Sequence, residues 1–263
     1  MTVSLEHFGD VQRIRMSSAA SRALGLDVSA YVVRNAMIDT GLPGVRRGLV
    51  DAARSLGVHG VLVTHWHEDH AGNVEPLARA GLPIWMHPDT EARLRDPTSL
   101  RLYRRIAWGT PPALRAAIEA FEPPGLERIA TPGHSPDHHI VWDSEAGTLF
   151  SGDLWLGVRA RAIHATENPY QIIESLTRAR ALAPARMFDA HRGQVIEPIG
   201  AITAKIEWLG DTLGEIERSV QLGMSDRAIV STLLGGEELA ATVSIGEYAR
   251  RNLVAAVRRH LDR

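Results

Sequence analysis

The sequence of 263 residues contains no cysteine. Disulfide bonds, thiolate metal ligands and a cysteine nucleophile are therefore all excluded. Any metal ion must be held by imidazole and carboxylate groups, which the 12 histidines and the 31 aspartates and glutamates can supply.

An excess of charge of one sign is also lacking. The 29 lysines and arginines nearly balance the 31 acidic residues, and the formal net charge is -2 at pH 7. This balance gives no global electrostatic reason to expect a nucleic-acid or membrane partner. A small-molecule substrate, either neutral or carrying a locally recognised anionic group, fits the composition better.

The first 16 residues contain no long apolar run, because Glu6, Asp10, Arg13 and Arg15 interrupt the hydrophobic residues. Such a segment has neither the apolar core of a secretion signal nor the length of a membrane span. We therefore expect a cytoplasmic protein with no membrane partner.

Hydrophobic residues make up 44% of the chain, which is enough for at least one sizeable core. Asn168 and Pro169 mark a helix start, since Asn caps free N–H groups and Pro fits the first turn. Short β-branched runs predict strands over 28–33, 36–38, 58–64, 127–131, 139–142, 148–150 and 185–190, with helices over 47–56 and 74–80. Two halves that each run strands into helices predict an α/β sandwich with helices outside.

From about Gly200 onward, apolar residues recur at intervals of three and four, as in Leu209, Leu213 and Ile216. This spacing is typical of helices. We predict a domain over 1–199 and a helical C-terminal appendage over 200–263, whose expected role is packing alone.

Candidate metal ligands cluster in the run His65-Trp66-His67-Glu68-Asp69-His70, directly after the expected strand 58–64. His65 and His67 can point to one side of a loop and share a metal ion. Asp69 and His70 follow on a tightening turn, where they face a second position a few ångströms away. This spacing is a strong indication of a metal site.

The run from Thr64 to Gly72 resembles the HxHxDH motif of the metallo-β-lactamase superfamily. Further stretches resemble other motifs of that family in the same order, namely Ile38-Asp39-Thr40-Gly41, Thr131-Pro132-Gly133-His134-Ser135, Phe150-Ser151-Gly152-Asp153 and Ala190-His191. The similarity spans roughly residues 28–195. It implies an αββα four-layer sandwich and a hydrolase with two divalent cations per chain. Zinc is expected, although imidazole and carboxylate ligands also suit iron or manganese.

The resemblance implies a role for each matching residue. The first metal ion would be held by His65, His67 and His134, the second by Asp69, His70 and His191, and Asp153 would bridge them. Asp39 would orient a ligand through a hydrogen bond without touching the metal. A bridged pair of cations lowers the pKa of the water between them and so supplies hydroxide at neutral pH. Asp69 is the expected catalytic residue, orienting this water and moving its proton.

Weaker candidates lie near these motifs. We expect His138 beside the metals, as an orienting group or substrate contact, because alternate positions from His134 point the same way along an extended segment. A surface role is the alternative. Arg159 and Arg161 could bind a carboxylate or phosphate of the substrate, or belong to a solvated loop.

Aromatic residues raise a second set of alternatives. Trp66 and Trp155 could wall an apolar pocket, with core packing as the alternative. The segment 88–124, which contains Trp108, could be a lid, a substrate channel or a dimer surface. A homodimer is therefore left open.

Two branches of the superfamily compete for the function. The Thr131 to His134 stretch is similar to glyoxalase-II-like thioesterases and related ester or lactone hydrolases. The Ser135 to His138 stretch and the helical tail resemble a β-lactamase-like branch with a winged-helix-like tail, which includes a single-strand RNA endonuclease.

Charge helps to choose between these branches. Residues 201–263 contain eight lysines and arginines against nine acidic residues, so the tail is not the basic surface that phosphate-backbone binding demands. The cluster Arg250, Arg251, Arg258 and Arg259 is a local exception. We therefore expect hydrolysis of an ester, thioester or lactone, with RNA cleavage as the second hypothesis and a non-catalytic metal-binding module as the third.

Overall fold

The computed structural model describes residues 1–23, 27–160 and 162–262. Contacts within the chain define two compact units. The first comprises Met1–Ala130, Asp137–Asp153 and Ala185–Ile196, and the second comprises Thr131–Pro136, Leu154–Pro184 and Glu197–Arg263. The predicted domain division between 199 and 200 stays a prediction.

The first unit contains a six-stranded sheet in the order β1-β2-β3-β4-β5-β6. Its strands are β1 (Thr2–Phe8), β2 (Val11–Ser17), β3 (Val28–Val33), β4 (Ala36–Ile38), β5 (Gly60–Leu62) and β6 (Ile84–Trp85). Neighbours from β1 to β4 are antiparallel, whereas β4, β5 and β6 are parallel. The predicted strands 28–33 and 36–38 are confirmed, and the predicted strand 58–64 is regular only in its centre.

No strand is predicted before residue 28, yet β1 and β2 form a hairpin. Gly9 lies in the turn with a φ of 69°, in the left-handed region that favours glycine. Glu6 pairs with Arg13 across the two strands at 3.0 Å. β1 is largely exposed, and its apolar residues alternate only from Val3 to Leu5, which is too short a run to predict a strand from the sequence.

The second sheet also belongs to the first unit and has the order β12-β11-β9-β8-β7. Its strands are β7 (Leu126–Ala130), β8 (His139–Asp143), β9 (Thr148–Phe150), β11 (Arg186–Asp189) and β12 (Gly193–Val195). β9 and β11 are parallel, and the other neighbours are antiparallel. The strands predicted over 127–131, 139–142, 148–150 and 185–190 are confirmed with small shifts of their ends.

The helices of the first unit are α1 (Ala19–Ala23), the 3-10 turn η1 (Pro43–Val45), α2 (Arg46–Ser55), α3 (Val74–Arg79), α4 (Pro88–Arg95) and α5 (Leu102–Ala107). α2 and α3 correspond to the two helices predicted there. Gly57 and Gly81 follow them with φ values of 64° and 85°, which is the conformation expected of helix-ending glycines.

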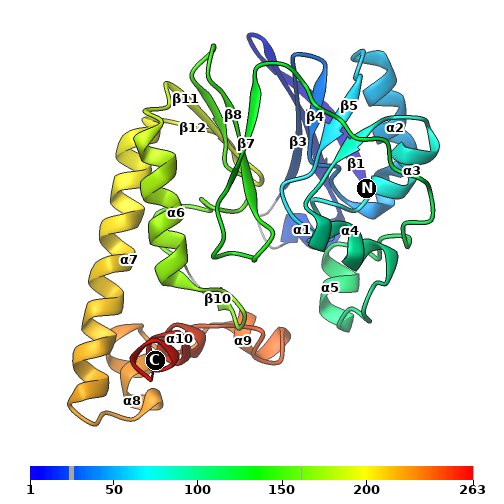
Figure 1. The fold of residues 1–263 in the computed structure, drawn as a ribbon. Helices are drawn as coiled ribbons and strands as arrows, with labels where there is room; N and C mark the ends of the chain where they lie inside the picture. The colour runs from blue at the N-terminus through cyan, green and yellow to red at the C-terminus, as the bar shows by residue number, and fades with distance from the viewer. Residues whose placement is uncertain (24–26, 161, 263) are drawn as a thin grey trace. The chain divides into compact units, whose positions relative to one another are not determined.

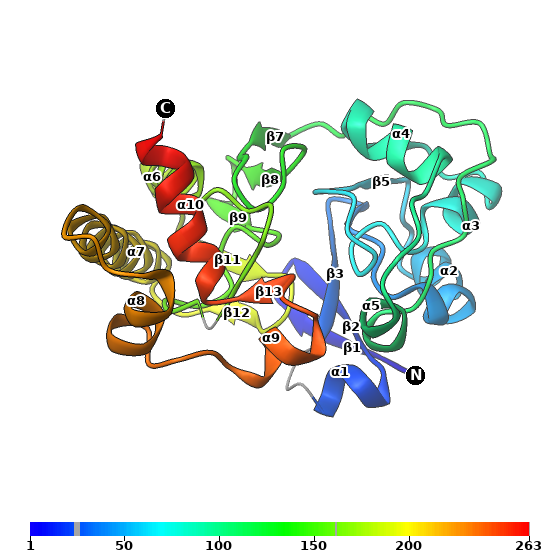
Figure 2. The ribbon, with the colours of Figure 1, turned by 90° about the horizontal axis from the view of Figure 1, so that it is seen from below.

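The two faces of the first sheet bury different side chains. On one face, Tyr31 packs with Phe150 and Phe188 of the second sheet, and the two phenylalanine rings stack at 5.6 Å. On the other face, Val32 packs with Leu49 of α2, so that helices α2 and α3 cover this side (Figures 1 and 2). Because β3 is buried on both faces, its residues are apolar except for Ser29, whose hydroxyl accepts a hydrogen bond from Nε of Arg13.

The second unit is mainly helical. It contains α6 (Pro169–Ala181), α7 (Pro198–Gln221), α8 (Asp226–Leu233), α9 (Leu239–Val243), α10 (Arg251–Leu261) and a two-stranded ladder of β10 (Ile163–His164) and β13 (Tyr248–Ala249). Asn168 caps α6 by accepting hydrogen bonds from the N–H groups of Tyr170 and Gln171, as predicted. α7 packs against α6 and α10 (Figure 1). The predicted C-terminal helices are confirmed, whereas the β10–β13 ladder was not predicted.

Within the described ranges, no helix combines the length and the hydropathy needed to cross a membrane.

Candidate metal centre

The predicted metal ligands of the first unit, and the orienting residue Asp39, lie just beyond the carboxyl ends of strands. Asp39 follows β4, His65 comes shortly after β5, Asp153 after β9 and His191 after β11. β4 with β5, and β9 with β11, are parallel pairs, and therefore the strands of each pair end at the same edge of their sheet. Each sheet thus delivers polar side chains at the edge where its parallel strands end.

The loop after β5 turns back on itself. The carbonyl of His67 accepts hydrogen bonds from the N–H groups of His70 and Ala71, at 3.0 and 2.8 Å. Nε2 of His65 lies 2.9 Å from Nδ1 of His67, so the two rings converge as their spacing predicts. The turn brings Asp69 and His70 back toward the same region.

A first group of ligand atoms comes from His65, His67 and Asp153, all buried, whose donor atoms lie within 4.8 Å of one another. Nε2 of His65 is 4.0 Å from Oδ2 of Asp153. The fourth residue expected in this group, His134, belongs to the second unit. There it is buried, with Nδ1 3.1 Å from Oε1 of Glu167. That His134 completes the first group stays a prediction.

A second group comprises Asp69, His70 and His191, again buried and within 4.8 Å of one another. Oδ2 of Asp69 lies 3.9 Å from Nε2 of His70 and 3.7 Å from Nε2 of His191. Oδ1 of Asp153 is 3.2 Å from both of these nitrogens. Asp153 therefore directs one oxygen toward His65 of the first group and the other toward the second group.

Asp39 supports this arrangement from behind His70. Its Oδ2 accepts a hydrogen bond from Nδ1 of His70 at 2.8 Å, and its Oδ1 accepts one from the N–H of Thr64 at 2.8 Å. With Nδ1 engaged, Nε2 of His70 is the nitrogen that faces the other ligands. This is the contact that the sequence resemblance implies for Asp39.

His191 is fixed in the same way by the backbone. Its Nδ1 donates to the carbonyl of Asp27 at 2.7 Å, and its N–H donates to Oδ1 of Asp189 at 2.7 Å. Nε2 is thereby turned toward Asp69 and Asp153. Asp189 was not singled out in the sequence, although its place at the end of β11, two residues before His191, was a usable signal.

His138 is fully buried, and its Nε2 accepts a hydrogen bond from the N–H of Asp153 at 3.1 Å. Its ring centroid lies 5.1 Å from that of His65. The contact with Asp153 fits the orienting role more closely than a substrate contact. The expectation of an extended segment from His134 to His138 is wrong, because turns and bends span residues 132–137.

Two buried contacts that the sequence did not reveal hold the ligand loop. Oδ2 of Asp137 accepts hydrogen bonds from the N–H of Trp66 at 3.0 Å and from the hydroxyl of Thr90 at 2.6 Å. Arg104 of α5 makes a two-pronged ion pair with Glu68, at 2.8 and 2.5 Å. These partners are 36 or more residues apart in the chain, and no local pattern links such positions.

Electrostatics in the cluster favour charge on the imidazoles. Burial would lower the pKa of His70, but the carboxylates of Asp153, Asp39 and Asp69 outweigh it and raise that pKa well above its usual value. Burial likewise opposes the charge on His191, whose pKa is raised to about 9 by Asp153 and Asp69. The pKa of Asp153 is held well below its usual range by these two histidines, despite its own burial. The carboxylates thus stabilise positive charge between them.

The remaining sequence candidates are two arginines and two tryptophans. Arg159 is exposed and belongs to the second unit, and Arg161 lies outside the described residues, so the predicted substrate docking at this pair stays a prediction. Trp155 is buried, and its Nε1 donates to the carbonyl of Ala201 at 3.1 Å, which fits the core-packing interpretation. Trp66 is half-buried, with its ring 4.6 Å from that of His67.

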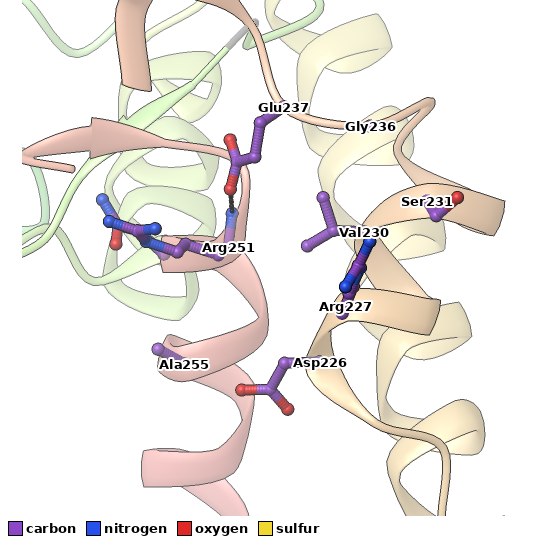
Figure 3. A pocket seen from close by; sticks show the side chains of 9 residues that line it. Asp226, Arg227, Val230, Ser231, Gly236, Glu237, Arg251 and Ala255 are labelled. Carbon is purple, nitrogen blue, oxygen red and sulfur yellow. Dashed lines mark hydrogen bonds between the residues drawn. The ribbon is translucent and has the colours of Figure 1, made fainter. Parts of the chain in front are cut away.

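The arginine cluster of the tail is partly neutralised. Arg250 pairs with Glu238, and Arg258 pairs with Asp226 at 2.7 Å. A cavity of about 530 Å³ in the second unit is lined by both acidic and basic side chains. Figure 3 shows the carboxylate of Glu237, which accepts a hydrogen bond from the backbone N–H of Arg251. The charged residues lining this cavity are Asp226, Arg227, Glu237 and Arg251.

Comparisons with known proteins agree with this arrangement. The model of a family described as the metallo-beta-lactamase superfamily matches residues 23–191. The "Beta-lactamase-like protein 2 homolog" of Drosophila melanogaster is 29% identical over 213 residues, which cover 72% of this chain and 69% of that protein. An atrochrysone carboxyl ACP thioesterase of Aspergillus fumigatus is 30% identical over 148 residues, which cover 56% of this chain and 31% of that protein.

Solved structures share the fold. A beta-lactamase domain protein from Burkholderia ambifaria matches with a TM-score of 0.69 and 21% identity, covering 97% of this chain and 88% of that chain. A metallo-beta-lactamase family protein from Thermus thermophilus matches with a TM-score of 0.64 and 21% identity, covering 96% of this chain and 92% of that chain. The predicted α/β sandwich class is confirmed by this likeness and by the two packed sheets of the first unit.

Proposed function

Because the chain belongs to the metallo-beta-lactamase superfamily and is a hydrolase of that fold, we propose that it binds two divalent cations and hydrolyses an ester, thioester or lactone. The observation that carries this proposal is the position of Asp153. One of its oxygens faces His65 and the other lies 3.2 Å from both His70 and His191. A carboxylate that bridges two ions needs this placement.

The residues present fit metal ions. Ligand atoms held at 2.0–2.1 Å by a tetrahedral zinc ion lie roughly 3.3 Å from one another, close to the separation of Asp153 Oδ1 from the two imidazole nitrogens. Nε2 of His70 is buried and makes no hydrogen bond to any described residue. Imidazoles and carboxylates without thiolates suit zinc, and also iron or manganese. We propose zinc as the resident ion.

His134 is proposed as the remaining ligand of the first ion. Within the second unit, its Nδ1 contacts the buried carboxylate of Glu167 at 3.1 Å, and we propose Nε2 as the nitrogen that binds the metal. A histidine that binds metal through one nitrogen usually donates to a carboxylate or carbonyl through the other. Glu167 was not singled out in the sequence, since it lies 33 residues from His134.

When bound, a pair of divalent cations supplies Lewis acidity, which lowers the pKa of water toward neutrality and polarises the scissile carbonyl. The chain supplies the geometry and the proton transfer. Asp69 would orient the attacking water through its carboxylate, accept its proton and pass that proton to the leaving oxygen or sulfur. Its Oδ2 is too far from His70 and His191 for hydrogen bonds, at 3.9 and 3.7 Å, so neither imidazole blocks this role.

Ester or thioester cleavage is preferred to RNA cleavage for two reasons. The arginines of the tail are partly paired with carboxylates, and a relative of this chain is named as a thioesterase. A non-catalytic role is the weakest alternative, because a protein that only binds metal needs no carboxylate poised as Asp69 is.

A substrate panel on metal-analysed protein tests the proposal. We expect hydrolysis of at least one activated thioester, ester or lactone, lost in Asp69→Ala protein that still binds metal. If the protein cleaves only single-stranded RNA, and this activity weakens with salt and is lost in Asp69→Ala, the chain belongs to the nuclease branch instead. Unchanged activity in Asp69→Ala would contradict the proposed role of this residue.

A further inference from the structure

Helix α5 is tied to the ligand loop by a buried ion pair. Nε and Nη2 of Arg104 donate to the two oxygens of Glu68, and both side chains are almost fully buried. Glu68 lies between His67 and Asp69, two of the proposed metal ligands. The first unit therefore holds α5 against the segment that carries the ligands.

The end of α5 is fixed by two more hydrogen bonds. The N–H of Trp108 donates to the carbonyl of Arg104 at 2.8 Å, and the carbonyl of Ala107 accepts from the hydroxyl of Ser18 at 3.2 Å. Gly109 follows with a φ of 102°, and a Cβ there would lie 3.6 Å from Pro43. The backbone that carries Trp108 is thus held in one place.

Trp108 lies beside the second group of ligands. Its ring centroid is 6.0 Å from that of His191, at an interplanar angle of 38°, and its side chain is half-buried. Trp66 is half-buried beside His67 in the first group, with ring centroids 4.6 Å apart. Two partly accessible indoles therefore border the cluster, one next to each group.

Two guanidinium groups that touch the ligand segments have carboxylate partners, and a third, that of Arg93, lies over the ring of Trp66 at 4.7 Å from its centroid. Arg13 donates to the carbonyl of His191 and pairs with Glu6 at 3.0 Å, and Arg104 pairs with Glu68. At Arg13, which contacts His191, and at Arg104 of α5, an anionic acyl group would have to compete with these carboxylates. An apolar acyl group would gain contact with the indole rings instead.

We propose that Trp108 contacts the substrate and that this site takes esters or thioesters with a bulky apolar acyl group. This inference rests on the proposed function and names its substrate class. Trp108 determines acyl specificity, while Arg104 is a positioning residue that acts through α5.

The test compares acyl chain lengths. For p-nitrophenyl esters and the corresponding thioesters, we expect wild-type kcat/KM to rise from the acetyl to the decanoyl substrate. In Trp108→Ala, kcat/KM for the decanoyl substrate should fall about 10- to 100-fold, the range expected for losing a buried aromatic contact. The value for the acetyl substrate should change less than about threefold, and Trp108→Phe should retain most of the preference.

Ile106→Ser is the matched control, because Ile106 is on the same helix but is 63% exposed. We expect it to leave the ratio of decanoyl to acetyl kcat/KM unchanged. An equal loss for both substrates in Trp108→Ala, or an unchanged ratio, would overturn the proposal. So would a loss of preference in Ile106→Ser alone, which would place the acyl group on the exposed face of α5.

A binding measurement separates this inference from the proposed function. Decanoate should bind the zinc-loaded wild-type protein at least about 10-fold more tightly than the Trp108→Ala variant, and acetate should not distinguish them. If no ester or thioester is cleaved but decanoate shows this difference, the proposed reaction is wrong and the apolar site stands. If esters are cleaved and decanoate shows no difference, the apolar site is wrong and the reaction stands.

Discussion

Nδ1 of His70 donates a hydrogen bond to Oδ2 of Asp39 across 2.8 Å, and this contact decides which nitrogen of His70 faces the other ligands. Asp39 follows β4 directly and has a φ of 61°, a left-handed conformation that Asp and Asn adopt more readily than most residues. The short turn after β4 thus places a carboxylate behind a proposed metal ligand.

Replacing Asp39 by asparagine should weaken metal binding without straining the backbone. Asn tolerates the left-handed conformation but brings no negative charge to His70, so zinc affinity of the second site should fall about 10- to 100-fold. Competition with a chromophoric chelator measures this. Asp143→Asn is the control, because Asp143 is also a buried carboxylate of the first unit but pairs with Arg34. Equal zinc affinities for the wild type and Asp39→Asn would contradict the proposed contact.

Zinc binding should release protons at neutral pH. In the metal-free protein, the pKa of His70 is raised well above its usual value and that of His191 to about 9, whereas metal-bound imidazoles must be neutral. The apparent zinc affinity should therefore rise with pH through the neutral range and level off only above the raised pKa values, that of His191 being about 9. Calorimetry in buffers of different ionisation enthalpy counts the protons. If zinc binding releases no protons at pH 7, these histidines are not charged in the metal-free protein.

The same groups give the metal-free protein a pH-dependent stability. A histidine whose pKa is raised on folding contributes stability that is complete below about 6.5 and is lost as pH rises through the folded value. The melting temperature of chelator-treated protein should therefore fall between about pH 7 and 9.5. Zinc-loaded protein should show a smaller change over this range, since its imidazoles bind metal instead of protons.

The core strands and the ligand loop were predictable because their signals are local. The run after β5 carries its ligands within six residues, and β3 is apolar except for Ser29 because both of its faces are buried. Asn168 indicates the start of α6, because its own side chain can cap the free N–H groups of the first turn. Such features need only neighbouring residues, which a sequence displays directly.

Other features depend on contacts between distant segments. Arg104 and Glu68 look like ordinary surface charges until α5 is placed against the ligand loop, and Glu167 has no sequence link to His134. The β1–β2 hairpin escaped notice because charged pairs such as Glu6 and Arg13 stabilise a largely exposed strand. The cytoplasmic location stays a prediction and the homodimer stays an open alternative, because they depend on compartments and partners.

Removing one partner of the buried ion pair should cost more stability than removing both charges. Arg104→Met leaves the charge of Glu68 buried without its partner, at a cost of about 3–5 kcal/mol in the free energy of unfolding. The double variant Glu68→Gln with Arg104→Met removes both charges and should recover most of that loss. Urea unfolding of the zinc-loaded proteins measures both. If the double variant is as unstable as Arg104→Met alone, the two side chains do not act as a pair.

A single methyl group at Gly152 should disturb the proposed bridging ligand. Gly152 has a φ of 49°, and a Cβ there would lie 2.7 Å from Nε2 of His138, which accepts the N–H of Asp153. Gly152→Ala should therefore shift Asp153, lowering bound zinc per chain and reducing kcat at least about 10-fold. Gly81→Ala is the control, since its φ of 85° is similarly strained but no atom lies within 4 Å of the added methyl group. Equal zinc content in both variants would show that the close contact between His138 and a Cβ at position 152 does not affect metal binding.

The most direct test of the metal centre is anomalous diffraction at the zinc edge from crystals of the zinc-loaded protein. We expect two peaks about 3.5–4 Å apart, one bound by His65 and His67, the other by Asp69, His70 and His191, with Asp153 touching both. A single peak, or two peaks with Asp153 bound to neither, would contradict the two-ion centre.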